Sequence, residues 1–200
     1  MIEQKPYALS CDRNTEHILK VFQEKLVGKN SFLEVGAGTG QHAISMAPHF
    51  PDMVWTLTDR KENHPGISLW LRDFPRANVR GPLEYEIGQS DFPSGDIDVV
   101  FCANVLHIIS WDLCLELFQD MGESLKKGTV FIAYGAYNYD GKFTSESNEK
   151  FNQWLIDRDP QSAIRDFEKV CDELRKRGFD LQEDIEMPAN NRMLFFEKRA

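Results

Sequence analysis

The strongest sign of a binding site in the sequence is an acid followed by three glycines: Glu34, Gly36, Gly38 and Gly40. A short apolar run ends at the acid, the three glycines follow at alternate positions, and Gln41 opens a predicted helix. Because glycine tolerates positive φ and has no Cβ, this pattern indicates backbone that lies against a bound molecule. The helix N-terminus offers free N–H groups that favour a carboxylate or phosphate. A tight structural turn with an exposed acid is the alternative.

The spacing of these glycines decides between ligand classes. A dinucleotide fingerprint, G-x-G-x-x-G, would need Gly or Ala where the chain has Gln41, and no G-x-x-x-x-G-K-[ST] phosphate loop is present. The remaining pattern, E-x-G-x-G-x-G from Glu34 to Gly40, resembles the loop of class I methyltransferases that use S-adenosylmethionine. An acid at the strand tip suits the ammonium group of that cofactor, directly or through water.

Acids also follow the next two predicted strands. Asp59 ends the strand over residues 54–58, about 20 residues past the glycines, where it is expected to accept hydrogen bonds from both ribose hydroxyls. Glu86 falls near the end of a strand over 79–87, where it could face the adenine amino group while Ile87 packs on the ring. A turn cap for Asp59 and a solvated loop position for Glu86 are the simpler readings.

The fourth predicted strand, over 98–104, should lie beside the first strand across the topological switch point. Asn104 would then leave the sheet near the methionine moiety and the transferable methyl group. His107 follows one helical turn later and is a candidate base, although a packed histidine is the commoner role. Arg13, before the first helix, could meet a carboxylate of cofactor or substrate, or lie on the surface beside a helix cap.

Candidates for contact with a methyl acceptor come from segments expected to surround a pocket after the fifth strand. They are His107, Tyr137, Glu146 and Asn191. Glu146 could equally serve a helix N-terminus, and Asn191 could equally shape a turn.

Composition limits the class of protein. Two hundred residues, 42% hydrophobic and 12% aromatic, suit one domain over 1–200, and the net charge of −9 argues against nucleic-acid binding. The four cysteines, Cys11, Cys102, Cys114 and Cys171, lack C-x-x-C pairing, so we expect reduced thiols and no metal site. No leader or membrane-length apolar run is evident, so a cytoplasmic protein without membrane contact is expected, with its oligomeric state open.

Strand and helix patterns alternate five times up to residue 134, which predicts an α/β fold with a parallel, doubly wound sheet. The first helix is expected to follow a cap at Asn14 or Thr15, and residues 135–143 are expected to form a loop. Two helices within about 144–178, the second carrying Ile164, form a predicted insertion over the substrate side. Strands over 179–185 and 192–198 must pair antiparallel because their connection is short.

Nearly the whole chain resembles one group of methyltransferases, which includes methyltransferase-like protein 26 and is described as domain of unknown function 938. The resemblance rests on residues 13–14, 33–43, 103–108, 141–148, 158–160, 164–166 and 187–191. It implies a seven-stranded, Rossmann-like, mostly parallel sheet with the last strand antiparallel. It also implies S-adenosylmethionine binding, although Glu86 stands where aspartate is typical of the family. The full predicted cofactor set is Arg13, Glu34, Gly36, Ala37, Gly38, Gly40, Asp59, Glu86, Ile87 and Asn104.

The predicted function is methyl transfer from S-adenosylmethionine, giving S-adenosylhomocysteine, to a small-molecule or peptidic acceptor. A non-catalytic protein that binds the cofactor and serves as an interaction module is the alternative. Aminopropyl transfer is disfavoured because no acidic polyamine site is recognisable, and a dehydrogenase is disfavoured by Gln41.

Overall fold

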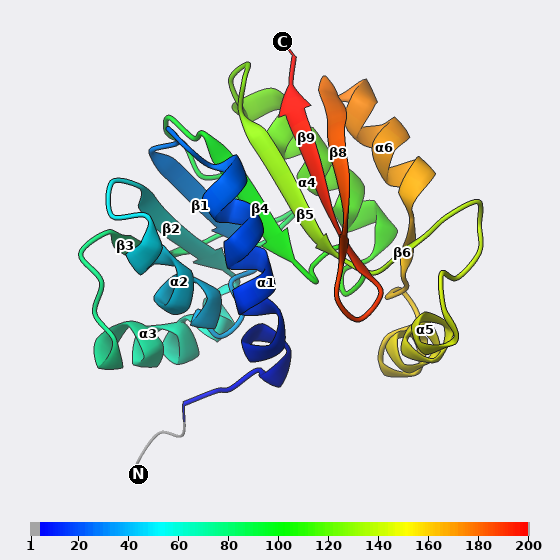
Figure 1. Ribbon diagram of the computed structural model, residues 1–200, viewed down its shortest axis with the longest axis horizontal. Coiled ribbons are helices and arrows are strands. Elements are labelled where there is room, and N and C mark those ends of the chain that lie inside the picture. Colours follow the sequence, from blue (N-terminus) through cyan, green and yellow to red (C-terminus); the bar gives the residue numbers. More distant parts are fainter. Residues whose placement is uncertain (1–4, 200) are drawn as a thin grey trace.

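Seven strands form one sheet in the computed structural model, which describes residues 5–199 (Figure 1). The strand order is β3-β2-β1-β4-β5-β9-β8, with β9 antiparallel to both of its neighbours and β1 to β5 mutually parallel. The prediction of a seven-stranded sheet with an antiparallel last strand is therefore confirmed. The strands are β1 (Ser31–Val35), β2 (Val54–Asp59), β3 (Val79–Glu84), β4 (Val99–Ala103), β5 (Val130–Gly135), β8 (Phe179–Met187) and β9 (Asn191–Lys198).

Helices cover both faces of this sheet, as the predicted doubly wound fold requires. Alternate strand residues enter different cores: Phe32 and Phe101 pack with α1 to α3, whereas Leu33 and Val100 pack with α4 and α6. The helices are α1 (Leu9–Lys25), α2 (Gln41–Met46), α3 (His64–Asp73), α4 (Trp111–Ser124), α5 (Glu146–Arg158) and α6 (Phe167–Lys176), with short 3-10 turns η1 (Ala47–His49) and η2 (Lys61–Asn63).

Helix α5 stands apart from these two layers, at the right of Figure 1 below the sheet. Leu155 packs with Ala136 and Ile164 in a small separate core, and Ser145 caps the helix by accepting a hydrogen bond from the Asn148 N–H. Helix α6 instead contributes Val170 and Leu174 to the main core. Only the first part of segment 144–178 therefore lies outside the layered domain.

Three predicted boundaries and one predicted loop were wrong. Helix α1 begins at Leu9, because its polar first turns are held by the next helix: Asp12 accepts a hydrogen bond from Gln41. Strand β3 ends at Glu84, because residues 86–90 form a turn in which the Ser90 hydroxyl accepts the Glu86 N–H. Ile164 precedes α6, and the expected loop over 135–143 contains β6 (Tyr137–Asn138), which pairs with β7 (Arg165–Asp166).

A buried polar network joins α1, α2, β1 and β2. Glu34 is 1% exposed, and its carboxylate accepts a 2.9 Å hydrogen bond from Trp55 Nε1 and lies 3.4 Å from His42 Nδ1. The other ring nitrogen of His42 lies 2.8 Å from Asn14 Oδ1, so both nitrogens face oxygen acceptors, as in an imidazolium. Burial lowers the pKa of His42, but hydrogen bonding to Cys11 and Glu34 and the negative charge of Glu34 raise it to about 10.

This network predicts a pH-dependent stability. A histidine pKa raised from 6.5 to about 10 contributes stability that is complete below pH 6.5 and is lost as the pH rises through about 10. We expect His42→Gln to lower the free energy of unfolding by about 3 kcal/mol at pH 6.5, because Glu34 stays buried without its partner. The difference from the unsubstituted protein should shrink toward pH 10.

Urea unfolding at several pH values measures this effect. His49→Gln, at an exposed position, is the matched control and should leave both stability and its pH profile unchanged. A His42→Gln protein whose stability deficit stays constant from pH 6.5 to 10 would contradict the assignment.

Candidate functional site

Two adjoining cavities lie at the carboxyl ends of the central strands. The first cavity, about 490 Å³, is lined by the glycine loop together with Asp59 and Glu86. The second cavity, about 650 Å³, lies between α1, α5 and the turn before β9. The two share three lining residues, Asn104, Ile108 and Arg158.

The glycine loop brings bare backbone to the first cavity. A Cβ on Gly36 would lie 2.7 Å from Val105 Cγ2, so the absence of a side chain lets β1 and the turn after β4 approach closely. Gly38 has φ +60°, and a Cβ there would meet no atom within 4 Å. The loop thus presents open main chain to the space beside it.

Asp59 fixes this loop to the end of β2. Its Oδ2 accepts a 2.6 Å hydrogen bond from the Gly38 N–H, and its Oδ1 accepts from the Arg60 N–H and the Asn63 amide at 2.8 and 2.7 Å. A carboxylate has about four lone-pair positions, so a further donor can still be accepted. Asp59 therefore shapes the cavity and keeps capacity to bind a ligand.

The far wall of the first cavity combines an acid with apolar side chains. Glu86 lines it, and Glu86 Oε1 accepts a 2.9 Å hydrogen bond from Gln89. Ile87, Ile109 and Leu113 line the same space. Such a wall suits a flat ring that carries a hydrogen-bond donor at its edge.

Asn104 occupies the junction of the two cavities in an uncommon conformation. Its φ is +60°, and its N–H donates a 2.8 Å hydrogen bond to the Tyr134 carbonyl. A Cβ on the neighbouring Gly135 would lie 3.7 Å from Asn104 Oδ1 and 3.2 Å from His107 Nδ1. Gly135 thus leaves room for both side chains.

His107 lines the second cavity and is only 3% exposed. Its ring meets Phe151 edge to face, with centroids 5.1 Å apart. Burial, with a smaller effect from the positive charge of Arg165, lowers the pKa of His107 to about 4. The imidazole is therefore neutral at pH 7 and able to accept a proton.

Arg165 holds the turn that carries Asn104 and His107. Its guanidinium donates to the carbonyl of Leu106 at 2.9 Å, to that of Ile109, and to that of Gln161 at 3.0 Å. A fork with several fixed donors suits this role. The turn after β4 is thereby tied to β7.

The structure brings together most of the predicted cofactor residues and separates the others. Gly36, Gly38, Asp59, Glu86, Ile87 and Asn104 line the first cavity. Glu34 and Ala37 are buried behind it, and Gly40 packs beside Ile67 at the start of α2. Arg13 lines the second cavity, not the first, because α1 crosses that side of the sheet.

The predicted acceptor residues divide in the same way. His107 and Asn191 line the second cavity, where the Asn191 amide also donates to the Pro188 carbonyl at 3.1 Å. Tyr137 lies in the main core, and burial raises its pKa well above 10.0. Glu146 is on the surface, where it pairs with Lys150. These last two positions lie outside both cavities.

Sequence reasoning missed three residues that line the second cavity: Phe151, Trp154 and Arg158. It also missed Arg165, which lines neither cavity but holds the turn after β4. The available signal was that Arg158 and Arg165 lie in segments 158–160 and 164–166, which carry the family resemblance.

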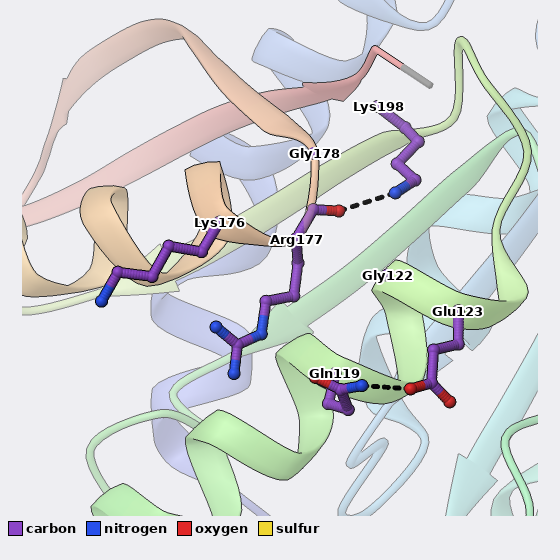
Figure 2. Close-up of a pocket in the computed structure, with 7 residues that line it drawn as sticks. All are labelled: Gln119, Gly122, Glu123, Lys176, Arg177, Gly178 and Lys198. Carbon is purple, nitrogen blue, oxygen red and sulfur yellow. Dashed lines mark hydrogen bonds between the residues drawn. The ribbon is translucent and has the colours of Figure 1, made fainter.

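A further hollow, between α4 and α6, lies near the opposite edge of the sheet (Figure 2). Its lysines have partners within the protein: Lys198 Nζ donates to the Arg177 carbonyl, and Lys176 pairs with Glu173. Arg177 Nε is buried and has no hydrogen-bond partner within the described part of the chain.

Among residues 5–199, no cluster of three or more His, Cys, Asp or Glu side chains could hold a metal ion. Within the same residues, every helix is too short or too polar to span a lipid bilayer.

Solved structures resemble the chain closely in fold. Human N-acetylserotonin methyltransferase, in complex with S-adenosylmethionine, matches with a TM-score of 0.79 and 17% identity over 96% of this chain and 53% of that one. An O-methyltransferase family 2 protein from Planctomyces limnophilus, in complex with apigenin, matches with a TM-score of 0.80 and 15% identity over 95% and 60%. At these identities the likeness establishes the fold, a Rossmann-like methyltransferase fold.

Sequence comparison gives a distant relative and a family. O-methyltransferase aoiF of Aspergillus oryzae is 24% identical over 146 residues, which are 72% of this chain but 34% of the relative. The chain thus spans about a third of that protein and little more than half of the solved structures. A family described as protein of unknown function, DUF938, matches residues 5–198. Because this match covers almost the whole chain, the protein belongs to the DUF938 family.

Proposed function

We propose that the protein binds S-adenosylmethionine in the first cavity and catalyses methyl transfer to a small molecule in the second. The observation that carries this proposal is the junction of the two cavities at Asn104, Ile108 and Arg158. A donor and an acceptor in adjoining cavities would face each other across that junction. The names of the similar O-methyltransferases support the same reaction class.

The residues of the first cavity fit this cofactor. Its volume of about 490 Å³ is in the range of small-molecule sites. Asp59 would accept from a ribose hydroxyl, and a bond to the second hydroxyl would replace the one from Asn63. Glu86 and Ile87 would meet the adenine edge and face, and Gly38 would let the chain lie against the amino-acid end. Glu34, already bonded to Trp55 and His42, would act from behind through the shape of the loop.

The protein's own part in the chemistry is alignment and the exclusion of water. When bound, S-adenosylmethionine supplies a methyl group already activated on a sulfonium. Asn104 and the turn held by Arg165 would fix the junction through which a nucleophile approaches, since positioning supplies much of the barrier reduction. His107, neutral at pH 7, would take the proton from a hydroxyl acceptor.

The non-catalytic alternative would need a cofactor site with no accessible acceptor cavity. The second cavity, with His107 and Asn191 in its lining, favours the enzyme.

All four cysteines are free thiols, which supports a reducing cytoplasmic compartment as the place of the reaction.

Labelled S-adenosylmethionine and a cell extract test the proposal. Incubation with the purified protein should label one metabolite, and the labelled product should be absent without the protein. Cofactor binding without transfer in any extract would favour the non-catalytic module.

Gly38→Val should abolish cofactor binding. The new side chain would enter open space beside the loop, and the φ of +60° adds about 2 kcal/mol of strain. We expect the rise in melting temperature caused by S-adenosylhomocysteine to disappear.

Gly28→Val is the matched control for Gly38→Val. Gly28 also has positive φ, +79°, with no atom within 4 Å of an added Cβ, but it precedes β1 at the other end of the strand. The Gly28→Val protein should lose as much stability as the Gly38→Val protein. S-adenosylhomocysteine should still raise its melting temperature as it does in the unsubstituted protein. Equal ligand responses in the two variants would refute the placement of the cofactor.

His107→Gln should lower kcat by at least about a hundredfold for a hydroxyl acceptor, since general bases contribute 10²–10⁴. Binding of S-adenosylhomocysteine, measured by calorimetry, should be unchanged, because His107 lines only the second cavity. In the unsubstituted enzyme kcat should fall as the pH drops through about 4, where the imidazole becomes protonated. An unchanged kcat in the variant would assign His107 to packing alone.

A further inference from the structure

We propose that the second cavity selects a planar, apolar acceptor that carries a carboxylate, and that Arg13 and Arg158 hold the carboxylate. This inference rests on the proposed function, because it names the class of molecule that the second cavity would take. Three features of the cavity support this inference. They are its positive charge, the absence of acidic partners for its two arginines, and the aromatic side chains of its wall.

The charge of the second cavity opposes that of the whole chain. Arg13 and Arg158 line it together with His17 and His107, and no Asp or Glu is among its lining residues. The chain as a whole has 32 acids against 23 Lys and Arg, a net charge of −9. A cavity with only cationic charge in such a protein concentrates anions and repels cations.

Neither arginine is neutralised by a neighbouring acid. Beside Arg13, Asp12 accepts a 2.9 Å hydrogen bond from Gln41, and beside Arg158, Asp159 Oδ1 accepts the Gln161 N–H at 2.9 Å. Within residues 5–199 neither guanidinium has a carboxylate oxygen within 4.0 Å. Both forks are therefore available to an anion from solution, which they can bind with two parallel hydrogen bonds each.

Aromatic side chains give the cavity an apolar wall. The rings of Phe151 and Trp154 are nearly parallel, with an angle of 15° and centroids 5.9 Å apart. His107 meets the edge of this wall at Phe151, and Arg158 lies over the Trp154 ring, with its Cζ 5.7 Å from the ring centre. Trp154 is 52% exposed, so much of its surface is free to cover a ligand.

These features discriminate among acceptors. An amine would meet two unpaired guanidinium groups and no carboxylate, which disfavours polyamines and basic peptides. A neutral planar molecule would cover the wall but leave the arginines without partners. A planar carboxylate satisfies both parts of the cavity.

Three matched probes test this inference: 2-naphthoate, 2-naphthamide and 2-naphthylmethylamine, titrated calorimetrically into protein saturated with S-adenosylhomocysteine. The probes share one bicyclic ring and differ in charge. We expect the carboxylate to bind at least about tenfold more tightly than the amide, the gain typical of charge-assisted hydrogen bonds. The amine should bind more weakly than the amide.

Arg13→Gln should reduce the preference for 2-naphthoate over 2-naphthamide to within about threefold, while Arg13→Lys keeps part of it. Lys20→Gln, which removes an exposed positive charge from the same helix outside the cavity, is the matched control and should leave the preference unchanged. Affinity for S-adenosylhomocysteine should be the same in all these variants, because Arg13 does not line the first cavity.

The outcomes separate the two proposals. Absence of S-adenosylhomocysteine binding would overturn the proposed function. Normal S-adenosylhomocysteine binding with no 2-naphthoate binding, with equal affinity for the three probes, or with a carboxylate preference that survives both Arg13→Gln and Arg158→Gln would overturn only the present inference.

Discussion

The reversal of strand order between β1 and β4 is the constraint on which the site depends. After β1 the chain continues to α2 on one face of the sheet, and after β4 it continues to α4 on the other face. A crevice therefore opens between the two segments that leave these strands. Gly36 and Val105 determine how closely the two segments approach each other, because a Cβ on Gly36 would lie 2.7 Å from Val105. Both cavities reach Asn104, directly after β4.

Other interactions hold the walls of this crevice in place. Asp59 binds the glycine loop on one side, and Arg165 binds the turn after β4 on the other. Gln41, whose amide oxygen accepts the Ala8 N–H at 2.6 Å, ties the start of α1 to the loop. The residue that argues against a dinucleotide fingerprint therefore has a structural task, which is to seat the helix that carries Arg13.

Much of the fold could be predicted from sequence because its signals are local. Hydrophobic periodicity identified the alternating strands and helices, and the short connection over 188–190 required an antiparallel pair. The pairing of β6 with β7 could not be predicted, because strands of two residues carry no periodicity and their partners are separated by α5. The early start of α1 depends on a hydrogen bond from Gln41, on another helix, so it could not be predicted from the sequence of α1 either.

The site was predictable only in part, for a related reason. Gly38, Asp59, Glu86 and Asn104 follow from the rule that ligands lie beyond the carboxyl ends of parallel strands. The partners of Glu34 are Trp55 on the next strand and His42 on α2, so its burial could not be read from its own segment. The second cavity joins α1 and α5, which are distant in sequence, and only their packing reveals its arginines.

A crystal structure of the protein with S-adenosylhomocysteine would show where the cofactor binds. We expect density in the crevice between β1 and β4, with the ribose beside Asp59, the adenine beside Glu86 and Ile87, and the sulfur facing Asn104. Density outside this crevice, or a ligand that runs in the opposite direction with its adenine at Asn104, would contradict this placement.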